Sequence, residues 1–328
     1  MLSIIQNDLD QIRNFDLTMW ESLRGKKIFA TGCTGFIGTW FIHSFNDLNS
    51  KLGLDASLTL LTRNKKKLED HPGISIVEGN ILDFTFPEGD FDYVIHGATE
   101  VAAFHSGENP GNLLDVAYIG TKRVIEFAKL KQVKKVLFLS SGAVYGKTLA
   151  IIPEDYLGAP DVQDTKSFYG EGKRLAEMLL FAEVPTVSAR IFASCGPFMP
   201  LNADFAFSNF LKASTLGLDI EIKGNGKTSR SYLYGSDLVL WLWTLLLKGK
   251  YGEAYNVGSE EEISILKLAE SIASVTRSKG KVTVRGSGDD FTRYIPSTLK
   301  AQEELGLKQL VSLDQSILKS FNFQKAFQ

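Results

Sequence analysis

The stretch Thr31-Gly32-Cys33-Thr34-Gly35-Phe36-Ile37-Gly38 decides the fold, because its three glycines stand between an apolar run and a helical pattern. The run before it, Lys27–Ala30, is typical of a buried strand. After it, Ile37, Phe41 and Phe45 recur at helical spacing. A helix that begins at a glycine turn presents unpaired N–H groups, and these can bind a phosphate. The pattern therefore predicts an α/β fold with a phosphate site at its first turn; the alternative is a tight turn without a ligand.

The same order of strand and helix continues through the first 190 residues. Candidate strands are Lys27–Ala30, Leu58–Leu61, Ile74–Val77, Tyr93–His96, Val136–Leu139 and Val187–Ile191. Helical patterns lie near 37–48, 112–130 and 168–183. Apolar strands that alternate with helices form a parallel sheet covered on both faces. We expect an α/β protein with a Rossmann-type doubly wound parallel sheet, in which the glycine turn binds the pyrophosphate of a dinucleotide.

Beyond about residue 190 the alternation weakens, which predicts a smaller, partly interleaved C-terminal substrate lobe. A short strand is expected at 255–257 and helices at 264–276 and 298–305. Ile5, Leu9 and Ile12 predict an amphipathic helix that docks on the body or on a partner subunit. The expected parts are a helical extension at 1–24, a dinucleotide-binding domain at 25–190 plus about 232–258, and the substrate lobe at 191–231 and 259–328.

Composition narrows the class of protein. A net charge of −2 offers no electrostatic reason to expect nucleic acid or an acidic membrane as partner. The apolar run Leu238–Leu247 is about half the length of a membrane span, so we expect a buried helix. Asp8 and Asp10 interrupt the first apolar residues, unlike a signal peptide. Cys33 and Cys195 with four histidines form neither a disulfide framework nor metal-ligand spacing, so we expect no metal and a cytoplasmic setting.

The end of the second strand is the expected position of the adenosine ribose. An NAD site often has a carboxylate there, whereas an NADP site offers cations to the 2′-phosphate. This chain has Thr62-Arg63-Asn64 and then Lys65–Lys67, without a carboxylate. Arg63 can form a forked pair with phosphate, so NADP(H) is preferred over NAD(H). Two alternatives stay open: the lysines form a solvated helix start, and Arg63 stacks on the adenine of either cofactor.

A candidate catalytic set follows the strand Val136–Leu139. Ser141 stands at its end, and downstream Tyr169 and Lys173 are four residues apart on one face of an expected helix. Tyr118 and Lys122 have the same spacing, but they precede the serine strand, so we interpret them as structural.

The chemistry requires both partners. A free phenol has a pKa of about 10 and is a poor base at neutral pH. A cation roughly 4 Å away is worth about 4 kcal/mol at an intermediate dielectric, so Lys173 is expected to lower the pKa of Tyr169 towards neutrality. Ser141 would then hold the reacting oxygen, while Ser140 points to the opposite side of the strand. A serine hydrolase fits poorly, because Ser141 lacks flanking glycines and no histidine motif accompanies it.

At these residues the chain resembles the extended short-chain dehydrogenase/reductases, the family of UDP-galactose 4-epimerase, sugar-nucleotide 4,6-dehydratases and 4-keto-sugar reductases. The shared motifs are the three glycines, Glu78–Ile81, His96–Ala98, Ser141–Gly146, Tyr169 with Lys173, Arg190, Gly224–Gly226, Arg230, Tyr232, Asp237 and Tyr255–Gly258. The resemblance implies a nucleotide-sugar substrate whose diphosphate is bound by Arg230 and Arg293. A surface ion pair is the alternative role for Arg293. The expected dinucleotide contacts are Gly32, Thr34, Gly35, Phe36, Ile37, Gly38, Arg63, Asn80, Ile81, Gly97, Ala98, Thr99, Tyr169 and Lys173.

Departures from the family pattern narrow the expected reaction. Dehydratases and sugar-acid decarboxylases of the family carry acidic residues where this chain has Gly142 and Ala143, so both reactions are disfavoured. A 4-epimerase or a 4-keto-sugar reductase needs only hydride transfer and Tyr169. A non-catalytic dinucleotide-binding relative is the alternative. Ala193 and the 116–117 pair replace two asparagines of the family, which implies an altered substrate pocket. The resemblance also implies a homodimer formed through the helices at 112–130 and 168–183.

Overall fold

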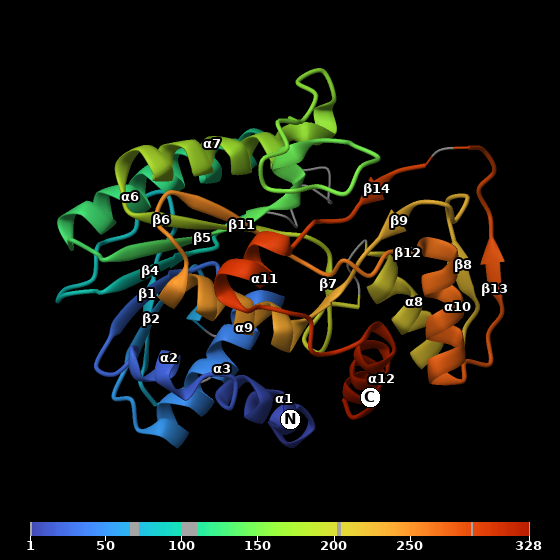
Figure 1. Cartoon of the computed structure of the whole chain (residues 1–328), viewed down its shortest axis with the longest axis horizontal. Helices are drawn as coiled ribbons and strands as arrows, with labels where there is room; N and C mark the ends of the chain where they lie inside the picture. Colours follow the sequence, from blue (N-terminus) through green and yellow to red (C-terminus); the bar gives the residue numbers. More distant parts are fainter. Residues whose placement is uncertain (1, 66–71, 100–109, 202–204, 290, 328) are drawn as a thin grey trace. The chain divides into compact units, whose positions relative to one another are not determined.

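The computed structural model describes residues 2–65, 72–99, 110–201, 205–289 and 291–327 (Figure 1). Lys66 and Lys67 therefore lie outside the described residues. The chain divides into two compact units. The first, here called the sheet unit, comprises 1–146, 159–191 and 239–255. The second unit comprises 147–158, 192–238 and 256–328.

A seven-stranded sheet has the order β11-β6-β5-β4-β1-β2-β3. The strands are β1 (Lys27–Thr31), β2 (Ser57–Thr62), β3 (Ile74–Glu78), β4 (Tyr93–His96), β5 (Lys135–Ser141), β6 (Thr186–Ile191) and β11 (Glu253–Val257). The pairings from β3 to β6 are all parallel, with Thr31 opposite His96. The chain builds outward from β1 through β2 and β3, then restarts beside β1 with β4. Loops after β1 and β4 therefore diverge, and such a switch point leaves a crevice where ligands bind. The predicted Rossmann-type fold is confirmed.

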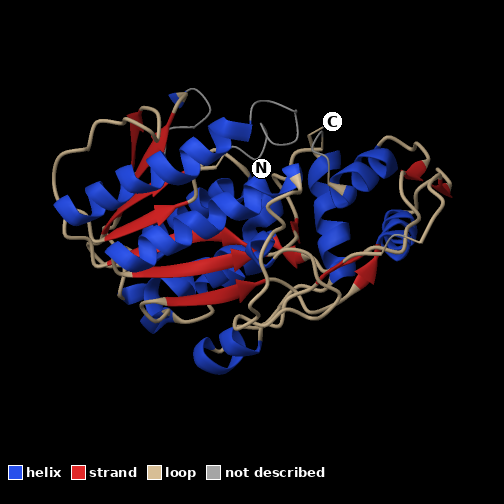
Figure 2. Ribbon diagram, turned by 90° about the horizontal axis from the view of Figure 1, so that it is seen from above, coloured by secondary structure: helices blue, strands red, loops and turns tan. Residues whose placement is uncertain are grey.

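Helices cover both faces of this sheet (Figures 1 and 2). On one side lie α3 (Phe36–Leu52) and α9 (Gly235–Lys248), joined by a hydrogen bond of 2.9 Å from the Trp243 indole to the Ser44 hydroxyl. On the other side lie α6 (Thr121–Leu130) and α7 (Phe168–Glu183). Phe29 and Phe127 centre the apolar core beneath them, with ring centroids 4.6 Å apart. Burial on both faces explains why the strands read as continuous apolar runs.

The N-terminal segment belongs to the sheet unit. Helix α1 (Leu2–Arg13) packs on α3 and buries Ile5, Leu9 and Ile12, as their spacing predicted. Arg13 pairs with Asp47 of α3. A short helix, α2 (Leu17–Glu21), follows, and the Trp20 indole donates to the Ile12 carbonyl at 3.2 Å. The N-terminal extension at 1–24 is thus packed into the sheet unit.

The expected helix at 112–130 is present and contains a π-helical turn. It consists of α5 (Pro110–Asp115), a π-helical turn η2 (Val116–Gly120), and α6. A π-turn accommodates an additional residue within a helix. Gly120 ends it where a Cβ would lie 3.1 Å from the Ile81 side chain, so a larger residue there would require Ile81 to shift by a few tenths of an ångström.

The second unit contains short strands and four helices among its described residues. They are β7 (Ser194–Cys195), α8 (Ala206–Thr215), β8 (Ile220–Ile222), β9 (Ser229–Arg230), β10 (Leu233–Tyr234), β12 (Ile263–Ser264), α10 (Ile265–Thr276), β13 (Val282–Val284), β14 (Arg293–Tyr294), α11 (Leu299–Leu305) and α12 (Leu313–Lys325). Helices α8, α10 and α12 enclose an apolar core that includes Phe207, Leu268 and Ile317.

Segment 147–158 lies in the second unit, whereas the sequence placed it in the dinucleotide-binding domain. Its contacts explain the difference. Ile152 bridges to Pro296, and the Ile152 carbonyl accepts a 2.8 Å hydrogen bond from the Asn256 amide. The Glu154 carboxylate accepts from the Asn256 backbone N–H, also at 2.8 Å. These partners are more than 100 residues away in sequence, so no local pattern indicates them.

Candidate active site

The three glycines of the first turn have different structural roles. Gly32 has φ +76°, and a Cβ there would lie 2.3 Å from the Gly97 backbone. A Cβ on Gly38 would lie 2.2 Å from the Cys33 backbone. Both positions require glycine because backbone segments touch. Gly35 differs: it is the N-cap of α3, and nothing lies within 4 Å of its Cβ position. The open space above a helix N-terminus fits a dinucleotide pyrophosphate.

The loop after β2 carries the residues expected near the ribose. Arg63 is exposed beyond the strand end, and the Thr62 hydroxyl accepts a hydrogen bond of 3.2 Å from the Asn64 N–H. Lys65 pairs with Glu78 at 3.9 Å. Asn80 is exposed, whereas Ile81 is 8% exposed and belongs to the apolar core. The loop therefore offers a guanidinium and an ammonium at this edge of the sheet.

A buried histidine joins the ends of β1 and β4 by hydrogen bonds. No role for this residue was predicted from the sequence. His96 Nδ1 lies 2.9 Å from the Thr31 hydroxyl, and Nε2 lies 3.1 Å from the Thr121 hydroxyl. The Thr31 oxygen also accepts from the N–H groups of Gly97 and Ala98 at 3.3 and 3.2 Å. The Thr31 hydroxyl therefore donates its proton to Nδ1 of His96. Nδ1 is then the acceptor nitrogen, so the ring proton is on Nε2. Burial, with the nearby Lys173 charge, lowers the His96 pKa to about 3, so the ring is neutral.

The predicted catalytic residues meet at the carboxyl end of β5. Ser141 ends that strand, and its side chain hydrogen-bonds to Tyr169 at the start of α7. The Ser141 Oγ also accepts from the Ala143 N–H at 3.1 Å. Ser140 has a buried Oγ without a hydrogen-bond partner among the described residues. Lys173 lies one helical turn after Tyr169, 5% exposed, and donates a 2.7 Å hydrogen bond to the Leu139 carbonyl.

The expected effect of Lys173 on Tyr169 is not what this geometry gives. Burial raises the pKa of Tyr169, and the Ser141 hydrogen bond only opposes that rise. Burial also lowers the pKa of Lys173 to about 8. The Lys173 ammonium lies 5.9 Å from the centroid of the Tyr169 ring and donates to the Leu139 carbonyl.

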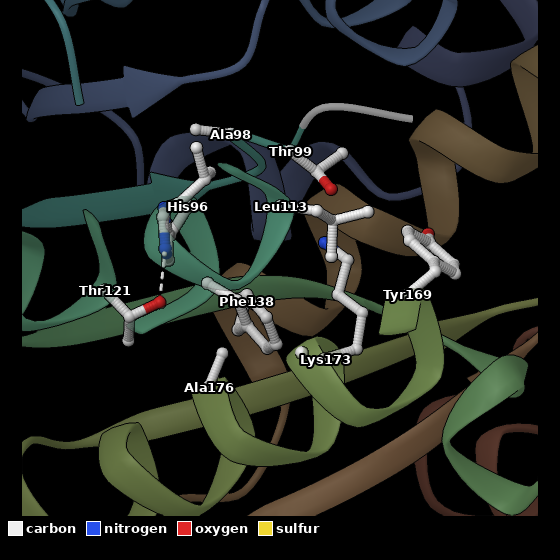
Figure 3. A pocket seen from close by; sticks show the side chains of 12 residues that line it. His96, Ala98, Thr99, Leu113, Thr121, Phe138, Tyr169, Lys173 and Ala176 are labelled. Atoms are coloured by element: carbon white, nitrogen blue, oxygen red, sulfur yellow. Dashed lines mark hydrogen bonds between the residues drawn. The ribbon is translucent and has the colours of Figure 1, made fainter. Parts of the chain in front are cut away.

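Tyr169 and Lys173 line a pocket within the sheet unit (Figure 3). Its walls come from β4 and the residues after it, from α5 and η2, and from α7. The lining residues are His96, Ala98, Thr99, Leu113, Val116, Ala117, Thr121, Phe138, Tyr169, Gly172, Lys173 and Ala176. Ala98 and Thr99, expected beside the dinucleotide, thus share one cavity with the catalytic candidates. Val116 and Ala117 give the wall an apolar surface.

The predicted substrate residues lie in the second unit and differ in their surroundings. Arg293 forms a multiple hydrogen-bonded ion pair with Glu262, and its Nη1 donates to the Leu149 carbonyl at 3.3 Å. Arg230 donates to the Ser229 carbonyl at 2.8 Å and to the Thr292 hydroxyl at 3.2 Å. No carboxylate of the described residues pairs with Arg230, and burial lowers its pKa. Arg230 therefore retains the capacity to bind an anion, whereas Arg293 already has a counter-charge.

Within the ranges that the structure describes, no helix is both long and apolar enough to cross a bilayer. The same ranges contain no cluster of three histidine, cysteine or acidic side chains that could bind a metal ion.

The fold and the site are those of a dinucleotide-binding enzyme class. Its features here are the glycine turn, the switch-point crevice and the Ser-Tyr-Lys set. Residues 28–258 match the model of the NAD dependent epimerase/dehydratase family, and the chain belongs to that family. UDP-glucuronic acid decarboxylase 6 of Arabidopsis thaliana is 29% identical over 301 residues, which cover 89% of this chain and 86% of that protein. The resemblance to the extended short-chain dehydrogenase/reductases is confirmed.

Two solved structures show the same fold. UDP-glucose 4-epimerase of Thermotoga maritima, determined with UDP-glucose, superposes with a TM-score of 0.78 at 21% identity, covering 92% of this chain and 100% of that chain. The WbmF enzyme of Bordetella bronchiseptica, determined with NAD⁺, superposes with a TM-score of 0.74 at 22% identity, covering 93% and 94%. The family thus unites NAD-dependent epimerases, dehydratases and decarboxylases of nucleotide sugars.

Proposed function

We propose that this protein transfers a hydride at a ring carbon of a nucleotide-linked sugar, as a 4-epimerase or a 4-keto-sugar reductase. The observation that carries the proposal is the set formed by Ser141, Tyr169 and Lys173 beside the cofactor crevice. It stands next to Gly142 and Ala143, which have no ionisable group. A site that has an acid–base phenol but no neighbouring carboxyl group can exchange one proton for each hydride.

In this mechanism Tyr169 exchanges the proton of the sugar hydroxyl, and Ser141 holds the same oxygen by a hydrogen bond. The nicotinamide ring supplies or accepts the hydride when the cofactor is bound. Lys173 contributes positive charge that favours the ionised phenol, although its ammonium is hydrogen-bonded to the Leu139 carbonyl. His96 remains neutral and does not add a second charge to the pocket.

The proposed cofactor is a nicotinamide dinucleotide, with NADP(H) preferred over NAD(H). Gly35 leaves room for the pyrophosphate at the N-terminus of α3. The exposed Arg63 and Lys65 supply the cations that a 2′-phosphate would need. For the substrate diphosphate, Arg230 is the stronger candidate and Arg293 the weaker one, because Glu262 occupies the Arg293 guanidinium.

We also propose that the protein acts as a homodimer in the cytoplasm. Helices α6 and α7 and the η2 turn expose Tyr118, Ile119, Leu130 and Met178, which are apolar surfaces suited to a second copy. Both Cys33 and Cys195 are free thiols, which suits a reducing compartment.

The test is to incubate the purified protein with UDP- and dTDP-hexoses and their 4-keto forms, with and without NADPH. An epimerase converts the sugar without net consumption of reduced cofactor. A reductase consumes NADPH in proportion to the product. Mass analysis of any cofactor that copurifies adds a second criterion, because a tightly held NAD favours the epimerase. Absence of both activities, together with dinucleotide binding that Tyr169→Phe leaves unchanged, would support a non-catalytic relative.

A second candidate is decarboxylation of a nucleotide-linked uronic acid, because the relative from Arabidopsis thaliana bears that name. Gly142 and Ala143 argue against it, since no acid is available there. UDP-glucuronic acid with NAD⁺ separates the possibilities: release of carbon dioxide would favour the decarboxylase. Dehydration is disfavoured for the same reason and would be recognised by a 4-keto-6-deoxy product.

A further inference from the structure

A buried carboxylate lies one helical turn beyond Lys173. Glu177 is 5% exposed and occupies the i+4 position after Lys173 on α7. Its oxygens accept from the Ser188 hydroxyl at 2.6 Å and from Arg190 Nε and Nη2 at 3.1 and 2.9 Å. Ser188 and Arg190 both belong to β6. A charge this deeply buried needs such partners, because an unpaired carboxylate would be strongly destabilised.

Arg190 extends the connection to the turn that follows Ser141. Its Nη1 donates a 2.8 Å hydrogen bond to the hydroxyl of Tyr145, which is 2% exposed. Tyr145 is the last residue of the 3₁₀ turn η3 (Gly142–Tyr145), directly after Ser141. One guanidinium therefore links the helix that carries Tyr169 and Lys173 to the turn that orients Ser141.

We propose that Glu177 and Arg190 form a buried positioning pair, which holds α7 against the Ser141 turn and keeps Lys173 positively charged. Only the kinetic test of this inference rests on the proposed hydride-transfer function. The pair itself touches neither substrate nor cofactor in the proposal. It acts through Lys173 on one side and through Tyr145 on the other.

The electrostatic part follows from the groups that face Lys173. From α7 these are Tyr169 and Glu177, from β4 the neutral His96, and from β5 the Phe138 ring at 4.9 Å and the Leu139 carbonyl. Glu177 is the negative charge in this set, and it opposes the burial that lowers the pKa of Lys173 to about 8. Burial also acts to lower the pKa of Arg190, but the hydrogen bonds and charge of Glu177 raise it overall.

The test compares Glu177→Gln with a matched control, Glu183→Gln. Glu183 lies on the same helix but is exposed and pairs with Lys129. Both changes remove one negative charge, but only Glu177 is buried beside Lys173 and paired with Arg190. We expect Glu177→Gln to lower kcat at least tenfold and to move the alkaline limb of the pH profile to lower pH. The control should leave the position of that limb unchanged.

An arm independent of activity uses urea unfolding between pH 6 and 10.5. Loss of the Glu177 charge should lower the pKa of Lys173, so the rise of stability with pH begins at lower pH in Glu177→Gln. In a Lys173→Met background the same change should have no such effect. Arg190→Lys retains the charge but cannot form the fork, so it should lower kcat without moving the limb. If Glu177→Gln does not fold, Arg190→Lys still tests whether the pair holds α7 against the Ser141 turn.

The outcomes separate this inference from the proposed function. Unshifted profiles in Glu177→Gln, or equal shifts in the Glu183 control, would overturn the electrostatic role. Unchanged kcat in Arg190→Lys would overturn the positional role. If no sugar substrate is turned over but the unfolding curves shift as expected, the proposed function fails while the tuning of Lys173 stands.

Discussion

The ammonium of Lys173 donates a 2.7 Å hydrogen bond to the carbonyl oxygen of Leu139, two residues before Ser141 on the same strand. A helix residue is thereby joined to the strand that carries the catalytic serine. Burial raises the pKa of Tyr169 and lowers the pKa of Lys173 to about 8, whereas the hydrogen bond to Leu139 favours the charged ammonium.

The lowered pKa of Lys173 predicts that burying this residue destabilises the fold by an amount that depends on pH. Its folded pKa is about 8 against the ordinary lysine value of 10.5, so the unfolded chain binds more protons between these values. Below pH 8 the full cost, of order 3 kcal/mol, opposes folding, and it disappears as the pH rises towards 10.5. The difference in unfolding free energy between wild type and Lys173→Met should therefore change over this window, measured by urea denaturation. A difference that is constant with pH would contradict the assigned pKa.

Tyr169→Phe tests the acid–base role. The phenol oxygen is removed while the ring remains, so the pocket keeps its shape. We expect kcat to fall roughly 10²- to 10⁴-fold, the usual contribution of a positioned acid–base group. Dinucleotide affinity, followed by fluorescence titration, should change little. Tyr118→Phe is the control, because Tyr118 has the same spacing to a lysine but is 43% exposed; equal losses in both variants would refute the assignment.

The glycine turn predicts separable effects of one added methyl group. Gly38→Ala forces a Cβ to within 2.2 Å of the Cys33 backbone, which should destabilise the protein by about 1–3 kcal/mol or more. Gly35→Ala meets open space and an ordinary extended backbone, so its thermal unfolding should stay near that of wild type. Dinucleotide affinity should nevertheless fall, because the methyl group occupies the phosphate site. Unimpaired binding by a folded Gly35→Ala would contradict this role.

His96 predicts acid sensitivity. Its folded pKa of about 3 lies below the ordinary histidine value of 6.5, so the unfolded chain binds the extra proton as the pH falls below 6.5. Stability should then decrease by roughly 1.4 kcal/mol per pH unit through this group until about pH 3. In His96→Gln, whose amide can still donate to Thr121, that component should vanish. Parallel stability curves for the two proteins between pH 7 and 5 would show that His96 is not the responsible group.

Arg63→Ala tests the cofactor preference. If Arg63 binds the 2′-phosphate, its loss removes charge-assisted hydrogen bonds worth about 1.5–3 kcal/mol, a factor of roughly 10 to 100. The KM for NADPH should rise accordingly, while the KM for NADH stays unchanged. Lys51→Ala serves as the control, since it removes an exposed cation from the far end of α3. An equal rise for both cofactors would indicate stacking on adenine.

Local patterns were sufficient for the parts of the fold that depend on local rules. The strand–glycine–helix order predicted β1, the turn and α3, and alternating apolar runs predicted the parallel sheet. The spacing of Tyr169 and Lys173 predicted their common helix. The π-turn at Val116–Gly120 was missed; its last residue, Gly120, packs closely on Ile81, about 40 residues away. Helices α8 and α12 were also missed.

The sequence by itself determined which residue types could perform the chemistry: glycines at the phosphate turn, a phenol with a lysine on one helical face, and no acid at 142–143. Tertiary structure alone decided how these groups interact. It directed Lys173 to a carbonyl, paired Arg293 with Glu262, and placed His96 between two threonines. The reason is physical: hydrogen-bond partners and burial depend on residues brought together from distant strands, and a pKa responds to both.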